Sequence, residues 1–314
     1  MSMDNFRHLY GPVPSRRLGR SLGIDLVPYK VCSYDCIYCQ LGSTGSTTVA
    51  RREYVPVDEI MEELEQKLAA GIAIDYISLA GSGEPTLHNG IGDIIRRIKL
   101  ITSIPVAVLT NGSLLWMEDL QDALMPADLL IPSLDAGDEA VFQEVNRPDS
   151  SISFDKMVQG LIDFSRRFKG EIWLEVFLLS GITDNEQAVK KIAELTQRIT
   201  PTRVQLNSVY RPPAEDYAFG LTSEQMEKLK SYFPGTVEII SESALHSVEP
   251  ASFDLSRQED IISLISRRPC TVNDVAVGLN MHQNDSLKQI GLLVSSGKLQ
   301  PAPGKSGFYI ISQH

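Results

Sequence analysis

Three of the four cysteines in the chain lie within eight residues, at Cys32, Cys36 and Cys39. Thiolates at C-x3-C-x2-C spacing on one short loop can ligate three irons of a cubane iron–sulfur cluster. Since only three ligands are present, the fourth iron of such a cluster would stay open to another molecule. The alternative is a structural zinc site, but a closed zinc site takes four ligands, and no fourth cysteine or histidine lies nearby in sequence. The spacing therefore favours an iron–sulfur cluster.

The composition indicates a globular protein of a reducing compartment. The chain has 314 residues, 43% of them hydrophobic, which is long enough for one large α/β domain and a small one. No run approaches about 18 consecutive apolar residues, and the amino terminus lacks the order of a secretion signal. We therefore expect a cytoplasmic protein without a membrane span. The net charge of -11 argues against non-specific affinity for nucleic acid.

Strand-like and helical patterns alternate along most of the chain. The cysteine loop follows a predicted strand at Leu22–Val27, which ends at Pro28. Six more strands are predicted at Tyr76–Ala80, Val106–Thr110, Leu129–Leu134, Glu171–Leu179, Arg203–Asn207 and Val237–Ile240. Helices are predicted at Val57–Leu68, Gly90–Leu100, Met117–Leu124, Phe154–Phe168, Gln187–Ile199 and Ser223–Phe233. The alternation predicts an α/β fold with a partial (β/α)6 TIM-like barrel, since eight full units rarely fit in about 240 residues.

The cysteine loop, with Tyr38 just before its last cysteine, resembles the signature of the radical S-adenosylmethionine (radical SAM) superfamily. This resemblance implies that Cys32, Cys36 and Cys39 bind a [4Fe-4S] cluster whose open iron is chelated by SAM. It implies further that the reduced cluster cleaves SAM to a 5′-deoxyadenosyl radical, with electrons from an external donor of the flavodoxin or ferredoxin type. Such chemistry needs a pocket that excludes water from the radical.

The resemblance extends to polar residues at the ends of later strands. Ser82-Gly83-Glu84 resembles the glycine-rich segment whose backbone pairs with the SAM amino group, although its first position is serine rather than glycine. Residues at the next two strand ends resemble those that bind the ribose and carboxylate of SAM, and the sixth strand end resembles segments that pack on adenine. Without a barrel, each would be an ordinary turn residue. The predicted cofactor-binding residues are Tyr38, Ser82, Gly83, Glu84, Asn111, Ser133, Asp135 and Asn207.

Four further charged positions have alternative interpretations. Arg16, Arg17 and Arg20 lie in a segment rich in turn formers, where they either bind an anionic group or form a solvated turn. Glu175 lies within the fifth βα strand, and a carboxylate facing the barrel interior would need a cation or a substrate group as partner.

The last thiol, Cys270, is predicted to be a small buried residue rather than a ligand.

A second domain is predicted at the carboxyl end, with domains at 1–248 and 255–314. Apolar patterns predict three short helices there, followed by a β-hairpin near 298–311, as in a winged helix-turn-helix. The recognition helix expected at Ser286–Ser296 offers only Lys288 as a cation, whereas groove-reading helices carry several. We therefore expect this module to dock an RNA, protein or peptide substrate, or another subunit, rather than to read a DNA sequence.

Within the superfamily, the chain resembles a group related to the wyosine-forming tRNA enzymes, through Gly11–Gly23, Cys36–Gly42 and Gly83–Thr86. It differs from those enzymes because Gln40 follows Cys39 and because no second cysteine set is present, so their tRNA chemistry cannot be carried over. Two hypotheses follow. One is a radical SAM enzyme that abstracts hydrogen from an unidentified substrate. The other is an iron–sulfur redox- or iron-sensing DNA-binding regulator, for which a complete cofactor barrel would be superfluous.

Overall fold

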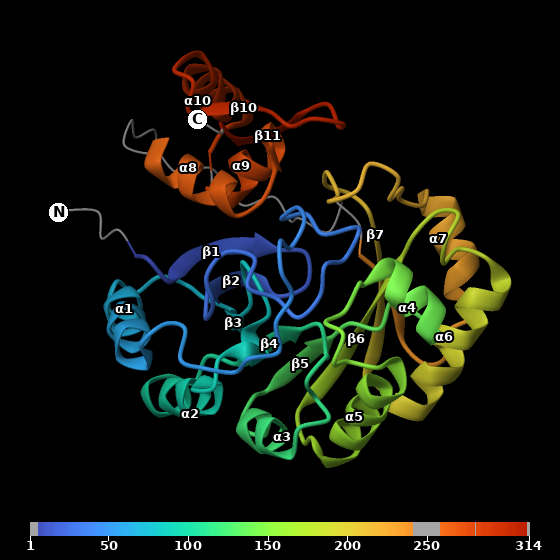
Figure 1. Cartoon of the computed structure of the whole chain (residues 1–314). Helices are drawn as coiled ribbons and strands as arrows, with labels where there is room; N and C mark the ends of the chain where they lie inside the picture. Colours follow the sequence, from blue (N-terminus) through green and yellow to red (C-terminus); the bar gives the residue numbers. More distant parts are fainter. Residues whose placement is uncertain (1–5, 241–257, 280, 313–314) are drawn as a thin grey trace.

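One curved sheet organises the computed structural model, which describes residues 6–240, 258–279 and 281–312 (Figure 1). Its eight strands lie in the order of the sequence, and β2 to β8 are parallel while β1 pairs antiparallel with β2. The strands are β1 (Leu9–Ser15), β2 (Gly19–Ile24), β3 (Tyr76–Leu79), β4 (Val106–Thr110), β5 (Leu129–Pro132), β6 (Glu171–Leu178), β7 (Arg203–Ser208) and β8 (Val237–Ile239). The predicted α/β fold is confirmed, and its mostly parallel sheet is consistent with a TIM-like barrel.

Helices connect successive parallel strands and cover the outer face of the sheet (Figure 1). They are α1 (Val57–Ala69), η1 (Pro85–Leu87), α2 (Ile91–Ile101), α3 (Glu118–Leu124), α4 (Glu139–Val145), α5 (Phe154–Arg167), α6 (Glu186–Ile199) and α7 (Ser223–Lys230). In α2, Ile91, Ile94, Ile95 and Ile98 recur at helical spacing, and all are fully buried in the core between helices and sheet. Of the described helices, none is long and apolar enough to cross a membrane. Cytoplasmic location stays a prediction.

The sequence did not predict strand β1. The strand predicted to begin at Leu22 is β2, which begins three residues earlier, at Gly19. Pro12 and Pro14 made this segment resemble a turn, but a proline is tolerated in an edge strand because such a strand leaves one side unpaired. The turn between the two strands ends at Gly19, whose φ of 62° is accessible to glycine at little cost. The hairpin places Arg16 and Arg17 at its tip, so these residues belong to the sheet edge rather than to a free loop.

A second, smaller unit follows the sheet. It consists of α8 (Gln258–Arg267), β9 (Cys270–Thr271), α9 (Val272–Gly278), α10 (Gln283–Ser295), β10 (Leu299–Pro301) and β11 (Phe308–Ile311). Its three strands pair antiparallel in the order β10-β11-β9, and Cys270 is fully buried in its own apolar core, as expected. The predicted helices and hairpin are present, whereas the winged-helix classification stays a prediction. The predicted boundary between 248 and 255 lies outside the described residues.

This carboxyl-terminal module lies over one edge of the barrel, with α9 beside β1 (Figure 1). Polar contacts join the two units. Arg267 pairs with Asp25, and Lys305 donates to the backbone carbonyl of Tyr210. Arg211 donates to the carbonyl of Pro269 at 3.0 Å. The module therefore forms one wall of the space above the carboxyl ends of the strands.

Candidate cofactor-binding site

A cavity of about 470 Å³ lies at the carboxyl ends of the parallel strands and is bounded by the barrel and the carboxyl-terminal module. All three cysteines of the loop line it. The predicted cofactor-binding residues that also line it are Tyr38, Ser82, Gly83, Glu84, Asn111, Ser133 and Asn207. The fold thus brings residues from five separate segments to one cavity, although their contacts with SAM stay predictions.

Each cysteine of the loop accepts a hydrogen bond from a nitrogen donor. The pairs are Asn111 Nδ2 to Cys32 Sγ at 3.6 Å, Asn146 Nδ2 to Cys36 Sγ at 3.5 Å, and Lys30 Nζ to Cys39 Sγ at 3.2 Å. Donors to sulfur stabilise thiolates and tune the reduction potential of a bound cluster. Lys30 and Asn146 were not predicted as site residues, because nothing in their local sequence indicates that they face a sulfur.

The environment of Cys32 and Cys36 disfavours a free thiolate. Burial and the nearby Glu84 raise the pKa of Cys32 to about 12, and burial raises the pKa of Cys36 well above its ordinary value. These thiols stay protonated unless a metal displaces the protons. In the described part of the chain, no three His, Cys, Asp or Glu side chains are arranged to hold one metal ion. Three thiols can each ligate one iron of a cubane cluster, whereas a closed zinc site takes four ligands.

The glycine-rich segment packs directly against the cysteine loop. The backbone N–H of Glu84 donates to Val31 O at 2.9 Å, and Lys30 N–H donates to Ser82 O at 2.6 Å. A Cβ atom on Gly83 would lie 2.2 Å from Val31 O, so a side chain at this position would clash with backbone. Glycine is therefore required where the two segments meet.

The Glu84 side chain is buried and fully engaged within the protein. Its carboxylate accepts hydrogen bonds from Thr86 N at 3.0 Å, Thr86 Oγ1 at 2.6 Å, Thr110 Oγ1 at 2.7 Å and Asn111 N at 2.8 Å. These bonds connect the segment after β3 to the end of β4. Glu84 thus fixes the backbone of the glycine-rich segment against the end of β4.

Tyr38 separates Asp135 from the cavity. Tyr38 Oη donates to Asp135 Oδ2 at 2.5 Å, and its ring stacks on Phe177 with centroids 3.9 Å apart. Asp135 also accepts from Asn146 Nδ2 at 2.8 Å and from Phe177 N at 3.1 Å. Burial raises the pKa of Asp135 to about 6, and the residue does not line the cavity. Its side chain therefore supports Tyr38, whereas its predicted contact with SAM would require access that Tyr38 limits.

Glu175 faces the barrel interior, and its partner is Arg17. The guanidinium donates to both carboxylate oxygens, at 3.0 and 2.5 Å, and Asn207 Nδ2 donates to Oε1 at 2.8 Å. Burial acts to raise the pKa of Glu175, but the charge and hydrogen bonds of Arg17, the hydrogen bond from Asn207 and the charge of Arg16 together hold the pKa below its ordinary value. Arg20, by contrast, pairs with Asp75 on the surface at 2.6 Å. The three amino-terminal arginines therefore have different environments.

The model of the radical SAM superfamily matches residues 26–195, a span that contains the cysteine loop, the glycine-rich segment and β3 to β6. The chain belongs to the radical SAM superfamily. Members of this superfamily use a [4Fe-4S] cluster and SAM, and the three thiols fit such a cluster. The predicted family is confirmed, whereas the likeness to the wyosine-forming group stays a prediction.

Two relatives match this radical SAM chain over most of its length. It is 35% identical to a UPF0026 protein of Methanocaldococcus jannaschii, over 92% of this chain and 91% of that protein. It is 44% identical to a protein of Brachyspira hyodysenteriae named GTPase Obg, over 94% of this chain but only 43% of that protein. The chain therefore spans less than half of the second relative.

A solved structure shares the fold. A radical SAM methyltransferase from Sphaerobacter thermophilus superposes with a TM-score of 0.53 at 17% identity, covering 71% of this chain and 68% of that chain. At this identity the likeness concerns the fold alone. It agrees with the mostly parallel sheet described above.

Proposed function

We propose that the protein is a radical SAM enzyme that reductively cleaves SAM to a 5′-deoxyadenosyl radical, which abstracts hydrogen from a substrate. The observation that carries this proposal is the cavity where Cys32, Cys36 and Cys39 meet the glycine-rich segment and the polar strand ends. A bound cluster with an open iron would supply the electron for cleavage. The protein's part is to hold the cofactors and to exclude water.

The residues around the cavity have distinct roles in this proposal. The three cysteines hold the cluster, and Asn111, Asn146 and Lys30 donate hydrogen bonds to their sulfurs. The backbone of Ser82 and Gly83 binds the SAM amino group, with Glu84 fixing that backbone from behind. Contacts with the remainder of SAM are proposed for Tyr38, Asn111, Ser133 and Asn207, which line the cavity, and for Asp135 if Tyr38 moves aside.

The carboxyl-terminal module is proposed to be a winged helix-turn-helix that encloses the substrate end of the cavity. Its Leu264, Asn273 and Val277 line the cavity together with barrel residues, which supports a role in substrate binding. Docking of an RNA, protein or peptide substrate, and electron supply by a flavodoxin- or ferredoxin-type donor, remain parts of the proposal. For the alternative of a DNA-binding regulator, the described residues offer no supporting feature beyond the order of the helices.

Anaerobic reconstitution tests the proposal. The full chain is loaded with iron and sulfide, mixed with SAM and a strong reductant, and assayed for 5′-deoxyadenosine. We expect product from the wild type and from Cys270→Ala, because Cys270 is buried in the core of the module and does not line the cavity. Cys36→Ala should lose both the cluster and the product. Absence of product from a wild type that carries the cluster, or full activity of Cys36→Ala, would refute the proposed function.

A further inference from the structure

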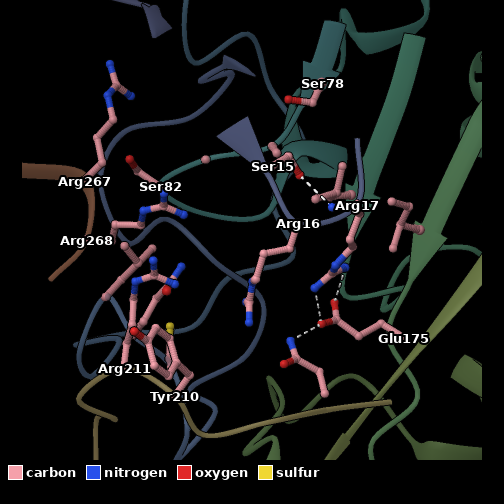
Figure 2. A pocket seen from close by; sticks show the side chains of 18 of the residues that line it. Ser15, Arg16, Arg17, Ser78, Ser82, Glu175, Tyr210, Arg211, Arg267 and Arg268 are labelled. Atoms are coloured by element: carbon pink, nitrogen blue, oxygen red, sulfur yellow. Dashed lines mark hydrogen bonds and ion pairs between the residues drawn. The ribbon is translucent and has the colours of Figure 1, made fainter. Parts of the chain in front are cut away.

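Five arginines surround the end of the cavity that lies beside the carboxyl-terminal module. They come from the hairpin tip, from the segment after β7 and from the end of α8: Arg16, Arg17, Arg211, Arg267 and Arg268. We refer to them as the arginine cluster. Figure 2 shows Arg16 extending between Arg17 on one side and Arg211 on the other, with Arg268 near Arg211, whereas the Arg267 side chain points away from them. Three segments far apart in the sequence thus direct cations to one space.

Three members of the arginine cluster already have a carboxylate partner. The pairs are Arg17 with Glu175, Arg211 with Asp274, and Arg267 with Asp25. Arg16 and Arg268 have no carboxylate within ion-pair distance among the described residues. Of the five arginines, two are therefore left without an ion-pair partner by the part of the chain that the structure describes.

Arg16 is in an unfavourable position unless an anion joins it. Its side chain makes no hydrogen bond to the described residues, and burial together with Arg211 and Arg17 lowers its pKa to about 10. A guanidinium still carries its charge at neutral pH. Holding a partly desolvated cation beside other cations costs free energy, and a bound anion would recover it.

We propose that the arginine cluster binds the phosphate group of a small phosphorylated substrate, with Arg16 and Arg268 as its principal ligands. This inference rests on the proposed function, because it names the substrate class of the same cavity. Two unneutralised charges match a phosphate dianion better than a single carboxylate, and the planar guanidinium fork donates to two phosphate oxygens at once.

The shape and charge of the protein favour a small molecule over a nucleic acid. In the proposed function the cavity of about 470 Å³ also holds the cluster and SAM, which leaves room for a compact substrate rather than a long chain. The whole chain carries a net charge of -11, which opposes binding of a long polyanion along its surface. Arg16 and Arg268 line the cavity, so an anion that binds to both of them must enter it.

Binding of inorganic pyrophosphate to the full-length protein, measured by isothermal titration calorimetry without reductant, tests this inference. We expect binding by the wild type that weakens about tenfold or more in Arg16→Ala and in Arg268→Ala, as for loss of a charge-assisted contact. Arg16→Lys should be intermediate, because it keeps the charge but not the fork. Arg166→Ala is the matched control, since Arg166 is exposed on α5 and far from the cavity lining. A melting temperature near that of the wild type establishes that each variant is folded.

Four outcomes would overturn the inference. The first is no pyrophosphate binding by the wild type, and the second is equal binding by the wild type and both alanine variants. The third is an equal loss of affinity for SAM itself, which would assign the arginine cluster to the cofactor carboxylate. The fourth is tighter binding of a single-stranded oligoribonucleotide with a steep salt dependence, which would indicate an RNA substrate. Because these titrations need no SAM cleavage, their failure is distinct from absence of 5′-deoxyadenosine in the activity assay.

Discussion

Arg211 and Asp274 form a buried ion pair at 2.9 Å that joins the barrel to the carboxyl-terminal module. The two side chains are 7% and 6% exposed, and Arg211 Nε also donates to Pro269 O at 3.0 Å. Asp274 in turn accepts hydrogen bonds from Thr271, which caps α9. The pair thus connects the segment after β7 to the helix that lies beside β1, and so holds the module over the cavity.

Replacing Arg211 by methionine should loosen this connection. Asp274 would keep Thr271 as a donor but lose its counter-charge, and removal of one partner of a buried pair costs about 3 kcal/mol or more. We expect faster hydrogen exchange of backbone amides in α8 and α9, with little change in α2. Arg198→Met, at an exposed position on α6, serves as the control. Unchanged exchange in the module of Arg211→Met would show that other contacts hold it in place.

Replacing Gly83 by alanine should separate the glycine-rich segment from the cysteine loop. The added Cβ would lie 2.2 Å from the backbone oxygen of Val31, which cannot move without displacing the loop. We expect a loss of about 1–3 kcal/mol in unfolding free energy and a lower iron content after reconstitution. Gly45→Ala is the control, because no atom lies within 4 Å of its added Cβ. Equal iron content in the two variants would contradict the requirement for glycine at position 83.

Replacing Arg17 by methionine should reverse the effect of acid on the contribution that Glu175 makes to the free energy of unfolding. In the wild type the pKa of Glu175 is held below its ordinary value of 4.5, so its stabilising contribution is present above that pH and is lost as the pH falls through the lowered pKa. Without Arg17, burial would raise the pKa of Glu175 above its ordinary value. Protonation of Glu175 would then remove a buried, unpaired charge and so stabilise the folded state of the variant. We therefore expect the stability gap between wild type and variant to narrow from pH 7 to pH 5.

Urea denaturation at both pH values measures that gap. The double variant Arg17→Met, Glu175→Gln provides the control, since it lacks the titrating carboxyl group and should show no such narrowing. If the difference in stability between the wild type and Arg17→Met were the same at both pH values, removal of Arg17 would not have changed the pKa of Glu175.

His88 should make the fold sensitive to mild acid. Its ring is fully buried, with Nε2–H donating to Val55 O at 2.8 Å and Nδ1 accepting from Gly90 N–H at 3.0 Å, so the neutral form is the one bound. Burial lowers its pKa below the ordinary value of 6.5. The unfolded chain therefore takes up a proton first, and unfolding free energy is lost as the pH falls below about 6.5, by up to about 1.4 kcal/mol per pH unit.

The variant His88→Gln isolates this contribution, because the amide can still donate to Val55 O but does not titrate. Urea midpoints of the wild type should fall more steeply than those of the variant between pH 7 and pH 5. Parallel pH profiles for the two proteins would assign the acid sensitivity to other groups.

The sequence alone determined the features that depend on neighbouring residues. The C-x3-C-x2-C spacing places three thiols on one loop whatever the remainder of the chain does, and it was enough to predict the radical SAM family. Period-2 and period-3.6 patterns likewise predicted all seven parallel strands. Local patterns failed at β1, where prolines resemble a turn and only pairing with β2 makes the segment a strand.

Only the tertiary structure decided the partners of the charged residues. Arg17 and Glu175 are 158 positions apart, and no local pattern distinguishes Arg17 from Arg20, although one faces the barrel interior and the other the surface. The same holds for Asn146, which lies 110 positions from the sulfur that it contacts. Such pairings depend on how strands and helices pack around the cavity. Packing also leaves Arg16 and Arg268 without a carboxylate partner among the described residues, and the proposed phosphate site rests on that arrangement.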